Sequence, residues 1–414
     1  MDLIVGSGIT GLSYANFCNH ANYLVIEQDS KIGGYCKTIK RNGFIWDYSG
    51  HFFHFRNKEI ENYLIKKIGK DNISRVKKNT QILYKDKFID FPFQKNIHQL
   101  NKIEFIDCLY DLFNNPFSSY TNFKEMLFAK FGKSISEKFL IPYNEKLYAC
   151  NLDSLDFDAM GRFFPYAEKE DIIKNFKNPD NVSYNSYFTY PHKGAIEYVN
   201  SLYSRLDKAK IKLDTKLLKI DYKNKIALTN KGNIKYNRII STIPFPNLLK
   251  ILNLDFDNNI YNWNKVLVFN LGFNKKGFDK KNHWIYFPEK KYSFYRIGYY
   301  DNILDQDRMS LYVELGFAKD EKIDANKFLK IVLEDLKKAK IIDDTFSLVD
   351  YEPLVMNPAY VHINSLSIKD VNKKKNFISE FDIYSIGRYG SWTYCSIEDN
   401  IIEAKKLTKK INNQ

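Results

Sequence analysis

The sequence predicts an α/β fold whose parallel sheet is assembled from separate parts of the chain. Residues 1–40 have the pattern of a strand, a glycine-rich turn, a helix and a second strand. Strand-like and helix-like stretches alternate along the rest of the chain. Residues 383–411 again contain a buried strand followed by a helix. Both ends of the chain are therefore predicted to join one sheet, with the intervening segments as insertions.

The predicted elements follow in chain order. Residues 3–5 form a short buried strand, residues 12–20 have helical spacing, and residues 23–27 form a second buried strand. Residues 95–144 are rich in helix formers with amphipathic spacing. The later elements are strand-like runs at 211–220, 225–229, 239–242 and 266–272, a helix at 321–339, a strand at 383–386, a turn at 387–388 and a helix at 398–411.

The composition indicates a globular protein. Of 414 residues, 44% are hydrophobic, and no apolar run is long enough to cross a membrane. Five scattered cysteines without a CxxC pair favour a reduced, cytoplasmic protein, and no cluster has the spacing of a metal site. The net charge of +14 comes from dispersed lysines, which indicate a solvated surface or an anionic small-molecule ligand. No nucleic-acid-binding signature is present.

The glycine-rich turn has the context of a dinucleotide-binding site. Gly6 permits a tight turn, Gly8 lets a pyrophosphate approach the backbone, and Gly11 allows close packing of helix and strand. The helix N-terminus offers free N–H groups to phosphates. Glu27, at the end of the second strand, is placed to accept hydrogen bonds from a ribose. An ordinary glycine turn is the alternative, and Glu27 argues against it.

Further glycines favour FAD over NAD. Gly33 and Gly34, six residues after Glu27, resemble the second glycine pair of the glutathione-reductase-like FAD family. Gly387 and Arg388 follow an apolar strand and resemble that family's C-terminal element, which closes over the flavin. The sequence therefore predicts FAD as the cofactor.

Six further strings narrow the class of flavoprotein. They are DYSGHFFH at 47–54, DFPFQ at 90–94, IPYNEKLY at 141–148, WIYFPE with FYR at 284–289 and 294–296, NPAY at 357–360 and GRYGSWTY at 387–394. Together they resemble the UDP-galactopyranose mutase family, and they are closer to its eukaryotic type. The likeness covers nearly the whole chain, with the strings in the order that the family has them.

The resemblance implies an isomerase that interconverts the pyranose and furanose forms of a UDP-sugar, either UDP-galactose or a related sugar such as UDP-arabinose. It implies a covalent adduct at N5 of reduced FAD, with NADPH or NADH as the reductant. The backbone carbonyl of His51 would face the flavin. The polar segment 168–185 would be a lid over bound UDP.

The predicted ligand contacts combine residue chemistry with the resemblance. A uracil needs an aromatic face and amide-type hydrogen bonds, although Phe91 taken alone favours a core position. A diphosphate needs an arginine fork and tyrosine hydroxyls. The predicted substrate residues are Phe91, Gln94, Tyr143, Asn144, Tyr148, Tyr286, Arg296, Tyr360 and Tyr394, and the predicted catalytic residues are His51, Arg296 and Arg162.

The resemblance also predicts the division of the chain. Residues 1–75, 195–245 and 378–414 would form a discontinuous Rossmann-like FAD-binding domain. Residues 95–165 would be a helical, uridine-binding insertion. Residues 76–94, 166–194 and 246–377 would form an antiparallel sheet domain that completes the substrate site.

Three positions depart from the family pattern. Tyr148 stands where the family usually has tryptophan, and Arg162 is one position out of step with the family's second phosphate arginine. The family's polar residue after the C-terminal tyrosine aligns with Ser396, or with Asn400 after a gap. These differences leave open a related sugar or a changed reaction. An FAD-dependent oxidase or desaturase of the amine-oxidase-like class is the alternative, and a homo-oligomer is compatible with the sequence.

Overall fold

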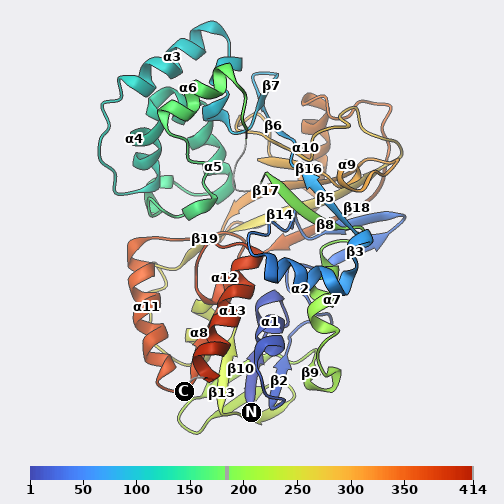
Figure 1. Ribbon diagram of the computed structural model, residues 1–414, viewed down its shortest axis with the longest axis vertical. Coiled ribbons are helices and arrows are strands. Elements are labelled where there is room, and N and C mark those ends of the chain that lie inside the picture. The colour runs from blue at the N-terminus through green and yellow to red at the C-terminus, as the bar shows by residue number, and fades with distance from the viewer. Residues whose placement is uncertain (182–185, 413–414) are drawn as a thin grey trace.

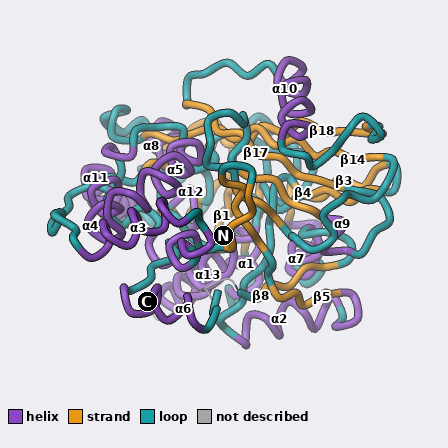
Figure 2. Tube along the Cα trace, turned by 90° about the horizontal axis from the view of Figure 1, so that it is seen from above, coloured by secondary structure: helices purple, strands orange, loops and turns teal. Residues whose placement is uncertain are grey.

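The computed structural model describes residues 1–181 and 186–412 and confirms the predicted α/β class. A parallel sheet lies at the end of the molecule that carries both termini, and a larger, mostly antiparallel sheet lies across its middle (Figure 1). Helices α3, α4 and α5 group together at one end of the molecule (Figure 1), and in the view from above they lie on the opposite side from strands β14 and β18 (Figure 2). Among the residues described, no helix combines the length and apolar character needed to span a bilayer.

The parallel sheet joins strands from distant parts of the chain in the order β20-β13-β1-β2-β9. Its strands are β1 (Asp2–Val5), β2 (Tyr23–Ile26), β9 (Ile211–Lys212), β13 (Arg238–Ser241) and β20 (Ile383–Ser385). Leu3 and Ile4 are fully buried on opposite faces because helices cover both sides, as parallel sheets require. The covering helices are α1 (Ile9–Phe17), α2 (Lys58–Ile68), α7 (Ile196–Tyr203), α8 (Phe245–Ile251), α11 (Ser365–Ser379) and α13 (Ile397–Asn412).

The larger sheet has the strand order β18-β14-β17-β16-β15-β6-β7, with β19 paired to β14. Its strands are β6 (Thr80–Tyr84), β7 (Lys87–Asp90), β14 (Asn262–Phe273), β15 (Trp284–Tyr286), β16 (Arg296–Tyr299), β17 (Ser310–Ala318), β18 (Leu348–Met356) and β19 (Val361–His362). All pairs are antiparallel except β15 with β6. Helix α10 (Ala325–Lys338) buries Val332 and Leu336 on one face, and α9 (Tyr300–Leu304) connects β16 to β17.

Three smaller sheets complete the strands. The first consists of β10 (Leu217–Asp221), β11 (Ile226–Thr229) and β12 (Gly232–Lys235). The second pairs β3 (Thr38–Arg41) with β4 (Phe44–Asp47), and the third pairs β5 (Ile73–Lys77) with β8 (Tyr187–Pro191). The predicted turn at 387–388 is wrong in detail, because Gly387–Gly390 forms the short helix α12. The three-domain boundaries given above stay a prediction.

The helical group consists of α3 (Lys102–Phe113), α4 (Phe123–Ile135), a π-helical turn (Ser136–Leu140) and α5 (Ile141–Tyr148). Helix α6 (Lys169–Lys177) packs on the same group, since Phe176 contacts Phe105 edge to face at 5.4 Å between ring centroids. Part of the predicted lid, 168–185, therefore forms a regular helix, and its residues 182–185 lie outside the described residues.

Candidate functional site

One cavity of about 1010 Å³ runs from the carboxyl end of the parallel sheet to the face of the larger sheet. Its volume is at the upper end of ordinary ligand sites, more than one small substrate needs. Most of the predicted site residues line it: Gly6, Gly8, Glu27, Gly34, His51, Phe91, Tyr143, Asn144, Arg162, Tyr286, Arg296, Tyr360, Arg388 and Tyr394. The fold thus brings residues from both ends and the middle of the chain to one site.

The glycine loop has the geometry that its sequence predicts. Gly6 has φ +105°, a conformation that side chains disfavour, and a Cβ there would collide with Thr242 Oγ1. A Cβ on Gly11 would collide with the carbonyl oxygen of Gly6, so Gly11 permits close packing without lining the cavity. Helix α1 has no side-chain cap at Gly8, and its buried first turn therefore offers uncapped N–H groups to an anion.

Glu27 is tied to the same loop. Its Oε2 accepts hydrogen bonds from the amide and hydroxyl of Ser7 at 2.8 and 2.9 Å, and its Oε1 accepts one from the amide of Asp29 at 3.0 Å. These three donors orient the carboxylate at the cavity wall, where Oε1 keeps one lone pair for a ligand.

The later glycines bring other segments close to this loop. The amide of Gly33 donates to Ser7 O at 3.0 Å, and a Cβ on Gly34 would lie 3.5 Å from Gly8 Cα. The amide of Gly387 donates to Glu403 at 2.8 Å, and a Cβ there would press on Thr10 Oγ1. Gly33 and Gly387 therefore shape the site from behind the cavity wall.

Arg296 and Glu314 form a buried ion pair at the opposite end of the cavity. Arg296 on β16 lies directly across from Glu314 on β17, and its Nε and one terminal nitrogen donate to the carboxylate at 2.7 and 2.9 Å. Ser49 Oγ donates to the same carboxylate. Burial opposes the charge on Arg296, but Glu314 outweighs it and keeps the arginine pKa above its ordinary value. Within residues 1–181 and 186–412, the second terminal nitrogen of Arg296 has no hydrogen-bond partner, and Arg296 lines the cavity.

Arg388 lies in the same cavity without a carboxylate partner among the described residues. Its guanidinium carbon is 4.6 Å from the ring centre of Tyr394 and 5.3 Å from that of Tyr360. One terminal nitrogen donates to Cys395 O at 3.2 Å, and the buried Nε has no hydrogen-bond partner within residues 1–181 and 186–412. A partly buried cation whose buried Nε–H is unused favours an anionic ligand.

His51 is held neutral between the two arginines. Burial, together with Arg388 and Arg296, lowers the pKa of His51 to about 4. Its amide donates to Ser49 O at 2.7 Å, which fixes the turn before Phe52. The residue lines the cavity.

A cluster of aromatic rings forms another wall. Phe91 and Tyr286 have ring centroids 4.9 Å apart, and Tyr143 meets Tyr286 edge to face at 5.1 Å. Asn144 donates to Leu140 O at 2.7 Å, while its buried Oδ1 has no partner in the described part of the chain. An amide oxygen beside these aromatic rings suits a planar, hydrogen-bonding ligand.

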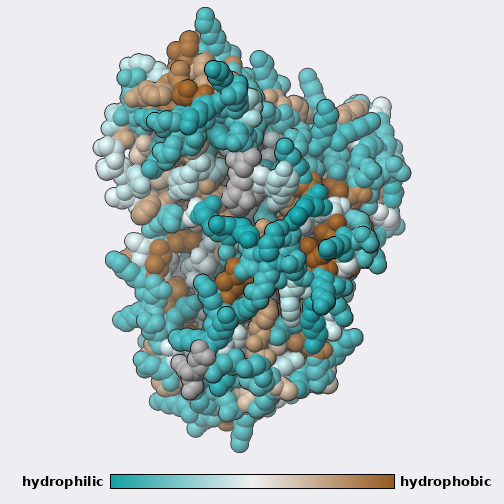
Figure 3. Space-filling view, viewed as in Figure 1, coloured by the Kyte–Doolittle hydropathy of each residue, from teal (hydrophilic) through white to brown (hydrophobic). Residues whose placement is uncertain are grey.

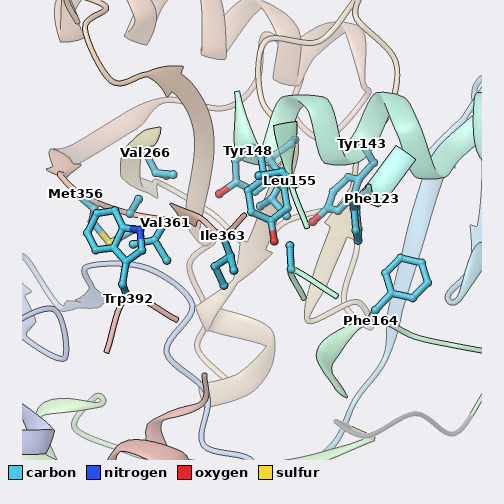
Figure 4. Packing of buried hydrophobic residues seen from close by; sticks show 14 of the residues in the cluster. Phe123, Tyr143, Tyr148, Leu155, Phe164, Val266, Met356, Val361, Ile363 and Trp392 are labelled. Carbon is cyan, nitrogen blue, oxygen red and sulfur yellow. The ribbon is translucent and has the colours of Figure 1, made fainter. Parts of the chain in front are cut away.

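Two predicted substrate residues do not line the cavity. Gln94 is fully buried and donates its amide to Pro165 O, so the side chain is used within the protein. Tyr148 packs behind Tyr360, with ring centroids 5.8 Å apart, and against Phe123. Figure 4 shows Tyr148 among the packed side chains of this core. As placed, both residues support the wall of the cavity from behind.

Arg162 lines the cavity but is already paired. Its guanidinium contacts both carboxylate oxygens of Asp399 at 2.8 Å and Ser396 Oγ at 3.4 Å. The side chain is about one-third exposed (34%) and lies near the ring of Phe163. Arg162 and Ser396, two of the positions that depart from the family pattern, thus lie together at one edge of the site.

Sequence reasoning missed Glu314, Tyr312 and Ser49. Glu314 is the single charged residue in the nine-residue strand β17, and that isolation in an apolar run is a signal for a paired buried charge. Tyr312 lies on the same face of β17, and its ring occupies the space that a Cβ on Gly298 would fill. Ser49 carries no comparable signal in the sequence.

Residues 4–65 match the family model of an NAD(P)-binding Rossmann-like domain, so the end of the molecule that carries the glycine loop is of the Rossmann class. Among solved structures, a reduced UDP-galactopyranose mutase is similar with a TM-score of 0.91 and 21% identity, over 100% of this chain and 93% of that one. A putative protoporphyrinogen oxidase from Exiguobacterium sp. 255-15 has a TM-score of 0.78 and 18% identity, over 100% and 99%. Putrescine oxidase has a TM-score of 0.65 and 12% identity, over 100% and 99%. These mutase and oxidase structures share the fold of this chain.

Proposed function

We propose that this chain is an FAD-dependent mutase that interconverts the pyranose and furanose forms of a UDP-sugar, with UDP-galactose or UDP-arabinose as the sugar nucleotide. One observation carries the proposal: a single cavity joins a dinucleotide-type glycine loop to two partly buried arginines. One end suits the adenine dinucleotide, and the other suits a second ligand with its own negative charge.

The residues at the first end fit FAD. The uncapped N-terminus of α1 would bind the pyrophosphate, and the Glu27 carboxylate would accept a hydrogen bond from a ribose hydroxyl. Gly34 would let the backbone approach the cofactor closely. The chemistry that bound, reduced FAD supplies is a nucleophilic nitrogen for the anomeric carbon of the sugar.

The residues at the second end would retain UDP while the sugar ring opens and closes. Arg296, oriented by Glu314, and the unpaired Arg388 would hold the diphosphate and stabilise its charge as a leaving group. The hydroxyls of Tyr286, Tyr360 and Tyr394 would add hydrogen bonds. The neutral imidazole of His51 would add no third positive charge beside the flavin.

The test compares the purified, FAD-loaded protein before and after anaerobic reduction with dithionite. Reduced protein incubated with UDP-galactopyranose or UDP-arabinopyranose is expected to yield a furanose isomer of identical mass, separable by anion-exchange chromatography. Arg296→Ala should lose UDP binding, measured by calorimetry, while the flavin absorbance stays. Arg41→Ala, which breaks an exposed ion pair with Asp350, is the matched control and should bind UDP normally.

Two outcomes would refute the mutase proposal. One is a protein that gives no isomer with either sugar nucleotide after full reduction. The other is turnover under air that consumes oxygen and changes the substrate mass, which would identify the oxidase alternative. A colourless protein that cannot be reconstituted with FAD would refute both the mutase proposal and the oxidase alternative.

A further inference from the structure

Lys146 on α5 is withdrawn from the surface that a lysine ordinarily occupies. Hydrophilic side chains cover most of the visible face of the molecule, in keeping with a sequence rich in lysine (Figure 3). Lys146 is instead partly buried, and within residues 1–181 and 186–412 no carboxylate lies within ion-pair distance of its ammonium group. Taking a cation out of water is costly, so this group needs other acceptors.

The acceptors are three backbone carbonyl groups of one turn. The ammonium nitrogen of Lys146 donates to Phe287 O at 2.8 Å and to Glu289 O at 3.2 Å. It also donates to Phe294 O. An ammonium group has three N–H donors, so these carbonyls use all of them. An apolar side chain at this position would leave the three carbonyls without this donor.

The turn joins two residues of the arginine end of the cavity. It comprises residues 287–295, which follow Tyr286 on β15 and precede Arg296 on β16. Tyr286 and Arg296 are paired across these two strands, and both line the cavity. Lys146 holds carbonyls near the beginning and near the end of the turn, so it fastens the ends of both strands at once.

The lysine itself belongs to the helix that carries part of the aromatic wall. Tyr143 and Asn144 precede Lys146 within the same helix and line the cavity. Helix α5 also lies tightly against β17, since a Cβ on Gly316 would collide with the carbonyl oxygen of Lys146. The backbone of Lys146 is thus fixed on β17, and its side chain ties the 287–295 turn to the same helix.

We propose that Lys146 is a positioning residue that sets the distance between the aromatic wall on α5 and the guanidinium group of Arg296. This inference rests on the proposed function, in which the wall contacts uracil and Arg296 holds the diphosphate. A ligand that spans both parts needs their spacing fixed, because a small misplacement weakens one contact or the other. Lys146 is not among the residues that line the cavity, so its effect passes through the turn.

Lys276 provides a matched control for general stabilisation. It is partly buried like Lys146, and its ammonium group donates to the carbonyl oxygens of Asp301 and Gln306 at 3.1 and 2.8 Å. It also pairs with the buried carboxylate of Asp301 at 3.0 Å, so its loss should destabilise the fold at least as much. Lys276 does not line the cavity and does not contact the 287–295 turn through a printed hydrogen bond or ion pair.

The test measures UDP binding by calorimetry on the full, FAD-loaded chain at pH 6. Burial lowers the pKa of Lys146 to about 7, against the opposing effects of Asp335 and Glu289, so the side chain is charged at this pH. Lys146→Met should raise the dissociation constant of UDP at least about tenfold while the flavin stays bound. Lys276→Met should change it by less than about twofold. Lys146→Gln, which keeps two N–H donors, should lose affinity by a smaller factor and serves as the second variant if Lys146→Met does not fold.

Hydrogen exchange gives a readout that does not depend on UDP. The amide of Phe287 donates to Tyr295 O at 2.8 Å, and the amide of Ser293 donates to Asp335 at 2.8 Å. A peptide covering residues 284–298 should exchange faster in Lys146→Met than in wild type or Lys276→Met, because the turn has lost its fastening.

Chemical rescue separates the role of the N–H donors from that of the charge. In Lys146→Ala, n-propylammonium supplies the missing carbons and the ammonium group, so it should restore part of the affinity for UDP. Tetramethylammonium carries the same charge without an N–H donor and should not restore it.

The outcomes distinguish this inference from the proposed function. Wild-type affinity in Lys146→Met, an equal loss in Lys276→Met or unchanged exchange of the 284–298 peptide would each overturn the positioning role and leave the proposed function intact. Rescue by tetramethylammonium as strong as that by n-propylammonium would also overturn it. A wild-type protein that binds no UDP is a separate result, which refutes the proposed function and the inference that rests on it.

Discussion

The substitution Glu314→Gln removes the negative charge that faces Arg296 while keeping the size of the side chain. Glu314 is buried, and its carboxylate receives two guanidinium hydrogen bonds and one from Ser49. Two charges at this separation attract by about 4 kcal/mol at an effective dielectric constant near 20. Removing one partner of a buried pair costs about 3–5 kcal/mol, because the other charge stays buried. We expect a loss near the lower figure, since glutamine still accepts hydrogen bonds.

Urea denaturation of the FAD-loaded protein measures this loss through tryptophan fluorescence. Trp46 is a local reporter, because its indole donates to Ser310 Oγ at the start of β17 at 2.9 Å. The matched control is Glu352→Gln, which alters an exposed ion pair with Arg41. Exposed pairs contribute at most about 1 kcal/mol, so this control should shift the midpoint little.

UDP gives the second arm of the same experiment. Its diphosphate would return negative charge to Arg296, so UDP should stabilise Glu314→Gln more than wild type, in which the pair is already neutral. The reasoning is refuted if the free energy of unfolding falls no further in Glu314→Gln than in Glu352→Gln. It is also refuted if UDP stabilises the variant no more than it stabilises wild type.

Two more predictions concern other parts of the cavity and core. Glu27→Ala should weaken FAD binding about ten- to a hundredfold, because one charged hydrogen bond contributes about 1.5–3 kcal/mol. Titration followed by flavin fluorescence measures the dissociation constant of FAD. An unchanged affinity would contradict the ribose assignment. Burial raises the pKa of Asp47 from 3.8 to about 6, so its contribution to stability is present in full below pH 4 and is lost as pH rises through 6. The free energy of unfolding of wild type relative to Asp47→Asn should therefore fall by about 2 kcal/mol between pH 4 and 6.5, and a flat difference would refute the assignment.

The sequence was most informative where function depends on backbone shape. Gly6 and Gly11 can be identified from spacing alone, because Gly6 has a φ of +105° and a Cβ on Gly11 would collide with the carbonyl oxygen of Gly6 in the same βαβ unit. Glu27 follows from its place at the end of β2, which pairs with β1 in the expected parallel register. These features are local, so no long-range contact needs to be known in advance.

Side-chain pairing across the larger sheet was not predictable. The register that places Arg296 opposite Glu314 depends on α9, which separates β16 from β17. Gln94 was assigned to the ligand from its place in a resembling string. In the structure its side-chain amide instead donates a hydrogen bond to the carbonyl oxygen of Pro165. Pro165 is 71 residues further along the chain, so this contact depends on the tertiary fold and not on the local motif. A motif therefore identifies which side chains gather near a site but does not decide which of them face inward.

The balance of charge at the arginine end of the cavity explains why the site suits an anion. Glu314 neutralises Arg296, and Asp399 neutralises Arg162. Arg388 has no such partner in the described part of the chain, and its neighbours are tyrosines. A protonated His51 would add a further positive charge, but the two nearby arginines and burial lower its pKa, so at neutral pH it stays uncharged. One buried positive charge thus remains uncompensated, and the site is stabilised most when a ligand supplies the missing negative charge.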